Sequence, residues 1–135
     1  LAFKINGGLS IDEPEHWARD IPEPPIVQAS AAQIEHGGEL YGEVCGFCHG
    51  IGVYGGPAVP DLRKMSEQTH RMFNEIVLEG VLEDRGMSNF SDRLSEADVN
   101  DIYAYINSRS WQDYKLQEEA KASTQSGEQT SALAN

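Results

Sequence analysis

Hydrophobic residues recur at helical spacing in three stretches of the chain, and each stretch follows a residue that can cap a helix. Ser30, with Gln33 three places on, forms a capping-box pattern that predicts a first helix leading into residue 45. Ser66 predicts the start of a second helix, which should end at Gly80. Ser95, with an acidic residue three places on, predicts a third helix that ends at about residue 108. The predicted apolar faces comprise Ile34, Tyr41 and Val44, then Thr69, Phe73, Ile76 and Val77, and finally Val99, Ile102, Tyr103 and Ile106.

The segments between these helices are typical of long loops. Residues 50–60 contain four glycines and two prolines, and residues 81–94 hold a Gly-Met-Ser-Asn-Phe run. Gly37 and Gly38 weaken the first helix by about 1 kcal/mol each relative to alanine, but they let another helix approach closely. The pattern therefore predicts an all-α fold of about three main helices, and no β-sheet is needed.

The N-terminal 29 residues form an extended arm in this interpretation. Residues 1–6 alternate apolar and polar side chains, which predicts a short strand whose partner belongs to another domain. Residues 11–29 contain four prolines and little periodicity, which predicts an extended linker. Its apolar residues either pin it to a domain surface or are incidental. They are Trp17, Ile21, Ile26 and Val27.

The C-terminal residues 111–135 form a polar tail. Helical propensity continues to about residue 122, and a Ser/Thr/Gln/Ala run follows that cannot bury enough apolar surface to stay ordered. The folded domain is therefore expected at residues 30–110.

The charge balance narrows the choice of partners. The 135-residue chain carries a formal net charge of −12, which disfavours nucleic acid and anionic membrane surfaces because both repel an acidic protein. No apolar run is long enough for a transmembrane helix. Residues 1–4 do not resemble a charged leader, so we expect the chain to be a processed or excised part of a longer product.

Both cysteines lie in the motif Cys45-Gly-Phe-Cys48-His49, which is typical of covalent haem attachment. Each thiol would add to a vinyl group of the porphyrin, and His49 would bind the iron. A redox disulfide is disfavoured because no βαβ pattern surrounds the motif. A zinc site would need further ligands, and the nearest spare histidines, His36 and His70, lack suitable spacing. The sequence therefore predicts one haem c.

The second iron ligand separates electron transfer from ligand binding or catalysis. The candidates are Met65, Met72, Met87, His36 and His70. Met87 is favoured because it follows a glycine in a loop, and loops commonly present ligands. A thioether ligand would raise the potential and close the iron to other ligands.

Two further roles are predicted around the haem. A backbone carbonyl from residues 55–60, at Pro57 or Pro60, would accept a hydrogen bond from His49 Nδ1 and fix the ring. Arg63 and Arg85 are candidates for pairing with the haem propionates, although each is equally well read as a surface arginine.

The order of these features resembles class I monohaem cytochrome c. The Cys45-x-x-Cys48-His49 motif, the proline-bearing loop, Met87 and a final aromatic-containing helix all match. The start of the chain, Val-Pro-Asp-Leu-Arg at residues 59–63 and Gly-Met-x-x-Phe at residues 86–90 resemble one subgroup. That subgroup is the C-terminal cytochrome domain of type II quinohaemoprotein alcohol dehydrogenases, which depend on pyrroloquinoline quinone (PQQ).

The resemblance implies a cytochrome c domain at residues 30–110 and one-electron transfer through iron bound by His49 and Met87. The electrons would come from a PQQ-dependent propeller domain, whose PQQ and calcium sites have no counterpart in this chain. Another redox protein or a quinone would accept them. Haem c assembly outside the cytoplasm implies a periplasmic location. The chain alone would then be an electron-transfer module.

Other functions remain open from the sequence. The chain could be a free-standing monohaem cytochrome c. It could be a haem enzyme or sensor with an open sixth site, which would need His36 or His70 as an acid–base group. A non-haem redox dithiol is the third alternative.

Overall fold

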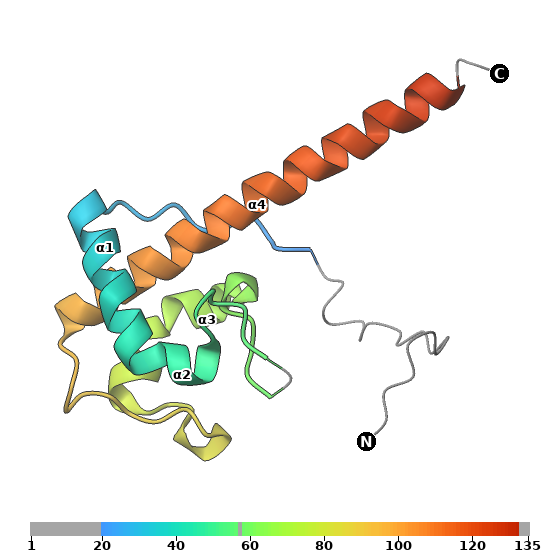
Figure 1. The fold of residues 1–135 in the computed structure, drawn as a ribbon. Coiled ribbons are helices and arrows are strands. Elements are labelled where there is room, and N and C mark those ends of the chain that lie inside the picture. The colour runs from blue at the N-terminus through green and yellow to red at the C-terminus, as the bar shows by residue number, and fades with distance from the viewer. Residues whose placement is uncertain (1–19, 57, 133–135) are drawn as a thin grey trace, which may run out of the picture.

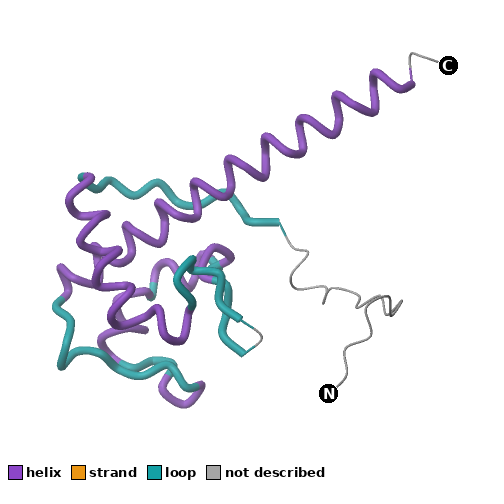
Figure 2. The backbone as a smooth tube through the Cα atoms, viewed as in Figure 1, coloured by secondary structure: helices purple, strands orange, loops and turns teal. Residues whose placement is uncertain are grey.

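The computed structural model describes residues 20–56 and 58–132, and over these residues the chain is helical. They contain no β-strand, and one isolated bridge joins Gly56 to Val59. The α-helices are α1 (Ala31–Leu40), α2 (Gly46–His49), α3 (Glu67–Arg71) and α4 (Glu96–Ala132). Short π-helices lie at η1 (Tyr41–Cys45) and η3 (Glu75–Glu79), and short 3-10 helices at η2 (Leu62–Lys64) and η4 (Glu83–Arg85). Loops join them (Figure 2), and the predicted all-α fold is confirmed.

The predicted helix starts are confirmed by their hydrogen bonds. The Ser30 hydroxyl accepts from the Gln33 amide at 3.3 Å, and the Gln33 side chain accepts from the Ser30 amide at 3.0 Å. Ser66 Oγ accepts from the Thr69 amide at 3.1 Å. Ser95 Oγ likewise accepts from the amide three residues on, at 3.2 Å. Each cap satisfies a backbone donor that the first helical turn leaves free.

Two of the predicted helices are less regular than the sequence suggests. The first continues from α1 through η1 into α2, so one helical path leads to residue 49. The second is interrupted at Met72, where φ is −101° and ψ is 17°, and it resumes before η3. Gly80 ends it with φ of 71°, a left-handed conformation that glycine adopts without strain.

Helix α1 crosses α4 (Figure 1), and the buried hydrophobic cluster is supplied by α4 and by segments outside α1. A Cβ atom on Gly37 would lie 1.9 Å from the backbone oxygen of Asp101, so only glycine allows this approach. The predicted packing use of Gly37 is therefore confirmed. The cluster of buried hydrophobic residues comprises Tyr41, Val53, Met65, Phe73, Val77, Leu94, Val99, Ile102 and Ile106.

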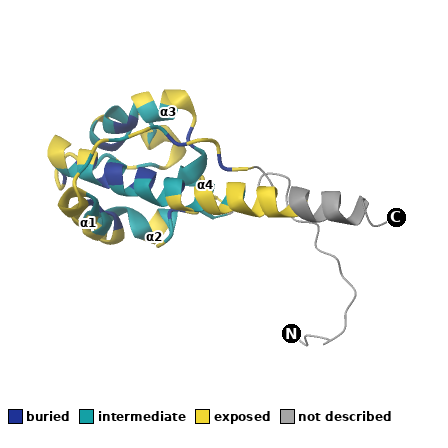
Figure 3. Cartoon of the chain, turned by 90° about the horizontal axis from the view of Figure 1, so that it is seen from above, coloured by how far each residue is buried: buried dark blue, intermediate teal, exposed yellow. Residues whose placement is uncertain are grey.

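The last helix is longer than expected. The sequence predicts an end near residue 108 and disorder after about residue 122, whereas α4 continues to Ala132. Its later part extends beyond the helical body and is exposed from residue 118 to residue 124 (Figures 1 and 3). Residues 20–25 bond to Trp111, Gln117 and Lys121, and these contacts support the helix beyond residue 108 as far as residue 121. No proline interrupts residues 111–132.

The part of the N-terminal arm that the structure describes runs alongside α4. Residues 20–29, named here the strap, have no regular secondary structure and lie beside this helix (Figure 1). Ile21 is buried, as a pinned linker requires, whereas Ile26 is 85% exposed and does not pin it. The strand predicted at residues 1–6 and Trp17 lie outside the described residues. Within the described residues, no helix has the length and apolar character needed to cross a membrane.

Candidate haem site

The two thiols lie at the end of the first helical path. Cys45 ends η1 and Cys48 lies in α2, one helical turn later. Residues three apart in a helix share a side of it, so both thiols can approach the same edge of a flat ligand. Cys45 is partly buried against the core cluster and Cys48 is exposed. Gly50 then ends the helix with φ of 75° and ψ of 157°.

His49 combines burial with an unused hydrogen-bonding atom. Burial lowers its pKa, and the carbonyl of Pro60 acts in the opposite direction. Nδ1 is buried, yet among the described residues it makes no hydrogen bond of normal length and angle, with Pro60 or any other group. The lowered pKa favours the neutral ring, which is the form that binds metals. Of the two prolines predicted to face this histidine, Pro60 lies near it, and Pro57 lies outside the described residues.

The loop after the motif folds back over His49. The Gly55 amide donates to the His49 carbonyl at 3.0 Å, and the Tyr41 hydroxyl donates to the Gly50 carbonyl at 2.8 Å. Gly55 has φ of 68°, and a Cβ there would lie 2.5 Å from the Pro60 oxygen. This close backbone approach requires glycine and brings the Pro60 carbonyl toward the histidine.

The three methionines have different surroundings. Met65 is buried as a member of the core cluster. Met72 accepts a hydrogen bond at its sulfur from Gln68 Nε2 at 3.7 Å. Met87 is partly buried and packs against the core from the loop after η4. The Met87 amide donates to the Leu82 carbonyl at 3.1 Å, which fixes the backbone at this position.

Both spare histidines are held by other side chains. His36 Nδ1 lies 2.9 Å from Asp101 Oδ2, and this contact raises the His36 pKa. His70 Nδ1 lies 2.9 Å from the Tyr103 hydroxyl, and burial lowers the His70 pKa. In the structure, therefore, each ring has a partner on α4.

Of the two candidate propionate partners, Arg63 is engaged within the protein. Its guanidinium lies 2.7 Å from Asp61 Oδ2 and 3.3 Å from Asp113 Oδ2, and it stacks on the Tyr54 ring at 4.2 Å from the centroid. Arg85 is exposed in η4. Tyr54 lies in a loop, Arg63 in η2 and Asp113 in α4. Because these residues are far apart in the chain and follow no repeating pattern, the sequence did not predict their contacts.

The thiols do not resemble a redox-active pair. Burial, with a smaller contribution from Cys48, raises the pKa of the Cys45 thiol to about 11. Reactive Cys-x-x-Cys pairs instead have a lowered thiol pKa. No group of three or more His, Cys, Asp or Glu side chains that could hold a metal ion occurs in the described part of the chain.

These residues fit a haem c. The two thiols lie one turn apart on a helix, and a neutral, partly buried imidazole follows directly. The Pro60 carbonyl near His49 is the kind of acceptor that orients a metal-bound histidine when Nδ1 donates to it. The fold and this motif together define a cytochrome c.

Comparison with known proteins identifies the family. The family model described as cytochrome c oxidase, cbb3-type, subunit III matches residues 32–106, more than half of the chain, and the chain belongs to this family. As a cytochrome c domain, it carries covalently bound haem c.

Its relatives include quinohemoprotein alcohol dehydrogenases of Pseudomonas putida. The chain is 40% identical to ADH IIB over 121 residues, which are 89% of the chain and 18% of that protein. It is 37% identical to ADH-IIG over 106 residues, which are 78% of the chain and 14% of that protein. The solved structure of ADHIIG from strain HK5 matches 77% of the chain and 15% of that protein, with a TM-score of 0.63 and 35% identity. The chain thus corresponds to less than a fifth of these relatives, and it is related to their cytochrome component.

Proposed function

We propose that this chain transfers one electron at a time, with Cys45 and Cys48 holding the haem and His49 binding its iron. Haem c supplies an iron that alternates between the ferric and ferrous states. The observation that carries the proposal is the state of His49. Its ring is partly buried with a lowered pKa, has a free Nδ1 beside the Pro60 carbonyl, and follows two thiols one helical turn apart.

The protein residues supply position and environment to the iron. Desolvation keeps the His49 ring neutral, so its Nε2 lone pair is available to a metal. After a small adjustment of the ring, the Pro60 carbonyl would accept a hydrogen bond from the Nδ1–H group, which would strengthen Nε2 as a donor to the metal. The bonds from Gly55 and Tyr41 to the backbone at His49 and Gly50 hold this arrangement in place.

We propose Met87 as the second ligand of the iron. Its loop is fixed on both sides, because the Met87 amide donates to Leu82 and the Phe90 amide donates to the Val77 carbonyl at 2.9 Å. Its side chain is partly buried against the core, where a thioether is protected from water. A thioether stabilises ferrous iron and raises the reduction potential, as a carrier at the end of an oxidation requires.

The contacts of the histidines favour a carrier over an enzyme or sensor with an open sixth site. Such a protein needs a distal group that moves protons near the iron. His36 is occupied by Asp101 and His70 by Tyr103, both on α4.

The assignment of Met87 can be tested by comparing Met87→Ala with Met72→Ala in the holoprotein. We expect Met87→Ala to lower the reduction potential and to open the iron to added ligands such as imidazole. Met72→Ala should leave both properties unchanged, because its sulfur bonds within the second helical stretch. If Met87→Ala keeps its potential and its closed coordination, the pairing of His49 with Met87 is wrong.

We also propose that the electrons come from a PQQ-dependent alcohol dehydrogenase domain and leave to another redox protein or a quinone, in the periplasm. The proposal is supported by relatives that are quinohemoprotein alcohol dehydrogenases and that are much longer than this chain. PQQ and calcium would belong to that other domain.

The intact mass of the native protein under denaturing conditions tests whether the chain is part of such a dehydrogenase. A mass of this chain plus one haem would overturn the covalent link to a dehydrogenase, whereas a mass several times larger with one haem would support it.

A further inference from the structure

The strap and the later part of α4 run in opposite directions and meet at three places. Trp111 Nε1 donates to the Pro25 carbonyl at 3.1 Å. Six residues further along the helix, Gln117 bonds to Ile21. Lys121 Nζ then lies 2.7 Å from Asp20 Oδ2. The contacts follow each other in reverse order along the two segments, so the strap has one defined register on the helix. Figure 1 shows the strap running beside α4.

Gln117 makes the most specific of these contacts. Its side-chain oxygen accepts from the Ile21 amide at 2.7 Å, and its side-chain nitrogen donates to the Ile21 carbonyl at 3.0 Å. The amide thus satisfies both backbone groups of one residue, as a neighbouring β-strand would. Because Ile21 is 8% exposed, these groups would otherwise lose their partners in a place that water reaches poorly.

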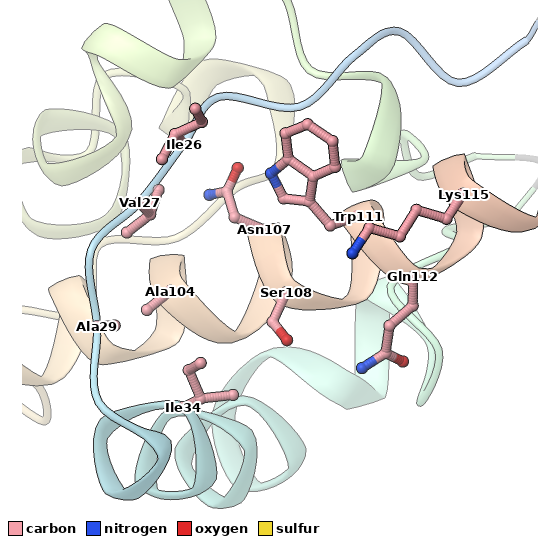
Figure 4. Close-up of a pocket in the computed structure, with 10 residues that line it drawn as sticks. All are labelled: Ile26, Val27, Ala29, Ile34, Ala104, Asn107, Ser108, Trp111, Gln112 and Lys115. Atoms are coloured by element: carbon pink, nitrogen blue, oxygen red, sulfur yellow. The ribbon is translucent and has the colours of Figure 1, made fainter. Parts of the chain in front are cut away.

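Apolar burial holds the strap at Ile21 and Pro24 but not at Ile26. Between the strap, α1 and α4 lies an open groove of about 550 Å³ (Figure 4). Its lining includes Ile26, Val27, Ile34, Asn107, Trp111 and Lys115. Figure 4 shows the strap spanning one side of this space, and Ile26 is 85% exposed beside it. The polar contacts with Trp111, Gln117 and Lys121 therefore add a defined register to the burial of Ile21 and Pro24.

We infer that residues 111–121 of α4 are a clamp for the strap, and that Gln117 is a positioning residue for electron transfer into the haem. The inference rests on the proposed function, in which a dehydrogenase domain lies on the N-terminal side of the strap. Domains joined by a free linker move relative to one another unless a contact fixes them. By holding the backbone of Ile21, Gln117 fixes where the connecting segment leaves the cytochrome domain. Because electron transfer slows steeply with distance, this position affects the rate at which the haem is reduced.

The test uses Gln117→Leu in the full-length holoprotein, with Gln112→Leu as the matched control. Gln112 is exposed on the same helix, and its side chain accepts from Arg109 rather than from the strap, at 2.9 Å. The first readout is hydrogen exchange at the Ile21 amide. We expect Gln117→Leu to accelerate it about tenfold, which corresponds to the loss of one net hydrogen bond. The control should exchange at the wild-type rate.

The second readout is the rate of haem reduction after a pulse of alcohol. We expect Gln117→Leu to slow this step while the haem potential and visible spectrum stay unchanged. Alcohol oxidation measured with a small dye that takes electrons directly from the dehydrogenase domain should also stay at the wild-type rate. This split separates an effect on positioning from general damage to either domain.

A conservative variant provides a rescue. In Gln117→Glu, a protonated carboxyl can accept from the Ile21 amide and donate to its carbonyl, as the natural amide does. The charged groups around it are Glu118, whose Oε1 accepts from Gln117 Nε2 at 3.3 Å, and Lys121 and Asp20, which pair with each other next to Glu118. The ionised form cannot donate. Haem reduction in this variant should therefore be fast below the pKa of the new carboxyl and slow above it, relative to wild type at each pH.

The outcomes distinguish two claims: that Gln117 clamps the strap, and that this clamp positions the domains for haem reduction. Unchanged exchange at Ile21 in Gln117→Leu would overturn the clamp. Faster exchange with unchanged haem reduction would overturn the positioning role. If alcohol does not reduce the haem even in the wild-type protein, the proposed function fails and the positioning role fails with it, whereas the exchange result still establishes or overturns the clamp.

Discussion

The two halves of α4 hold their neighbours by different physical means. From Glu96 to Ser110 the helix buries apolar side chains, among them Val99 at 0% and Ile102 at 1% exposure. From Trp111 onward its contacts with the strap are hydrogen bonds and an ion pair, and Leu116 is 62% exposed. Figure 3 shows the change from buried to exposed residues along the helix. One helix therefore stabilises the core through its first half and positions a connecting segment through its second.

The difference shows that two roles can be separated along a single helix. One part stabilises the fold by apolar burial, and the other fixes the position of a neighbouring segment by polar contacts. Apolar burial contributes most of the stability, because each large side chain removed from water is worth about 1.5–3 kcal/mol. Hydrogen bonds such as those of Gln117 contribute about 0.5–1.5 kcal/mol each, but they specify which atoms meet. Substitutions in the two halves should differ accordingly.

The largest expected effect comes from truncating a core residue in the first half. Ile102→Ala should lower the free energy of unfolding by about 2–5 kcal/mol, because it removes buried methyl groups and leaves a cavity. Leu116→Ala, in the exposed second half, should change it by less than about 0.5 kcal/mol. Denaturant unfolding of the two holoproteins measures both values. Equal losses would show that the second half is also packed against the core.

A smaller but still large effect is expected at the crossing of α1 and α4. Gly37→Ala would place a Cβ 1.9 Å from the Asp101 oxygen, and a backbone atom cannot move aside cheaply. We expect a loss of about 1–3 kcal/mol as the helices separate.

The matched control at this crossing is Gly42→Ala. A Cβ at Gly42 meets nothing within 4 Å, so the change should be neutral or stabilising by up to about 1 kcal/mol. The same unfolding measurement applies to both variants. A Gly37→Ala protein as stable as wild type would contradict the close approach of these two helices.

The first half of α4 was predictable from the sequence, and the second half was not. Val99, Ile102 and Ile106 repeat at helical spacing, and this spacing correctly predicts their burial. The contacts of Gln117 and Lys121 depend on partners 96 and 101 positions away in the chain, and polar residues on an exposed helix carry no periodic signal. The sequence therefore predicts a helix end near residue 108, where the apolar pattern stops.

At the candidate haem site, too, local patterns were predictable from the sequence and contacts between distant residues were not. The motif at Cys45, Cys48 and His49 is local, so the sequence alone indicates its chemistry. The loop sequence predicts that a carbonyl at Pro57 or Pro60 faces His49 without choosing between them, and the structure places Pro60 near His49. The pairing of Arg63 with Asp113 was not anticipated, because it joins residues 50 positions apart without a shared pattern.

The smallest effect concerns the two polar contacts that the halves of α4 make with other segments, and here pH separates them. In the first half, Asp101 raises the His36 pKa above its usual 6.5 through a hydrogen bond and through charge, to which Asp98 and Glu39 add. In the second half, the Lys121 pKa is raised from 10.5 by Asp20 and Glu118.

A group with a raised pKa contributes stability below its pKa in the unfolded chain, and this contribution is lost as pH rises through its pKa in the folded protein. The His36 contribution should therefore be present below its usual pKa of 6.5 and lost as pH rises through the raised folded value, whereas Lys121 stays charged over this range. Asp101→Asn should destabilise the holoprotein more at about pH 6 than at about pH 9, and Asp20→Asn should have the same small effect at both. Denaturation midpoints at the two pH values measure this, and a pH-independent effect of Asp101→Asn would show that its interaction with His36 is not ionic.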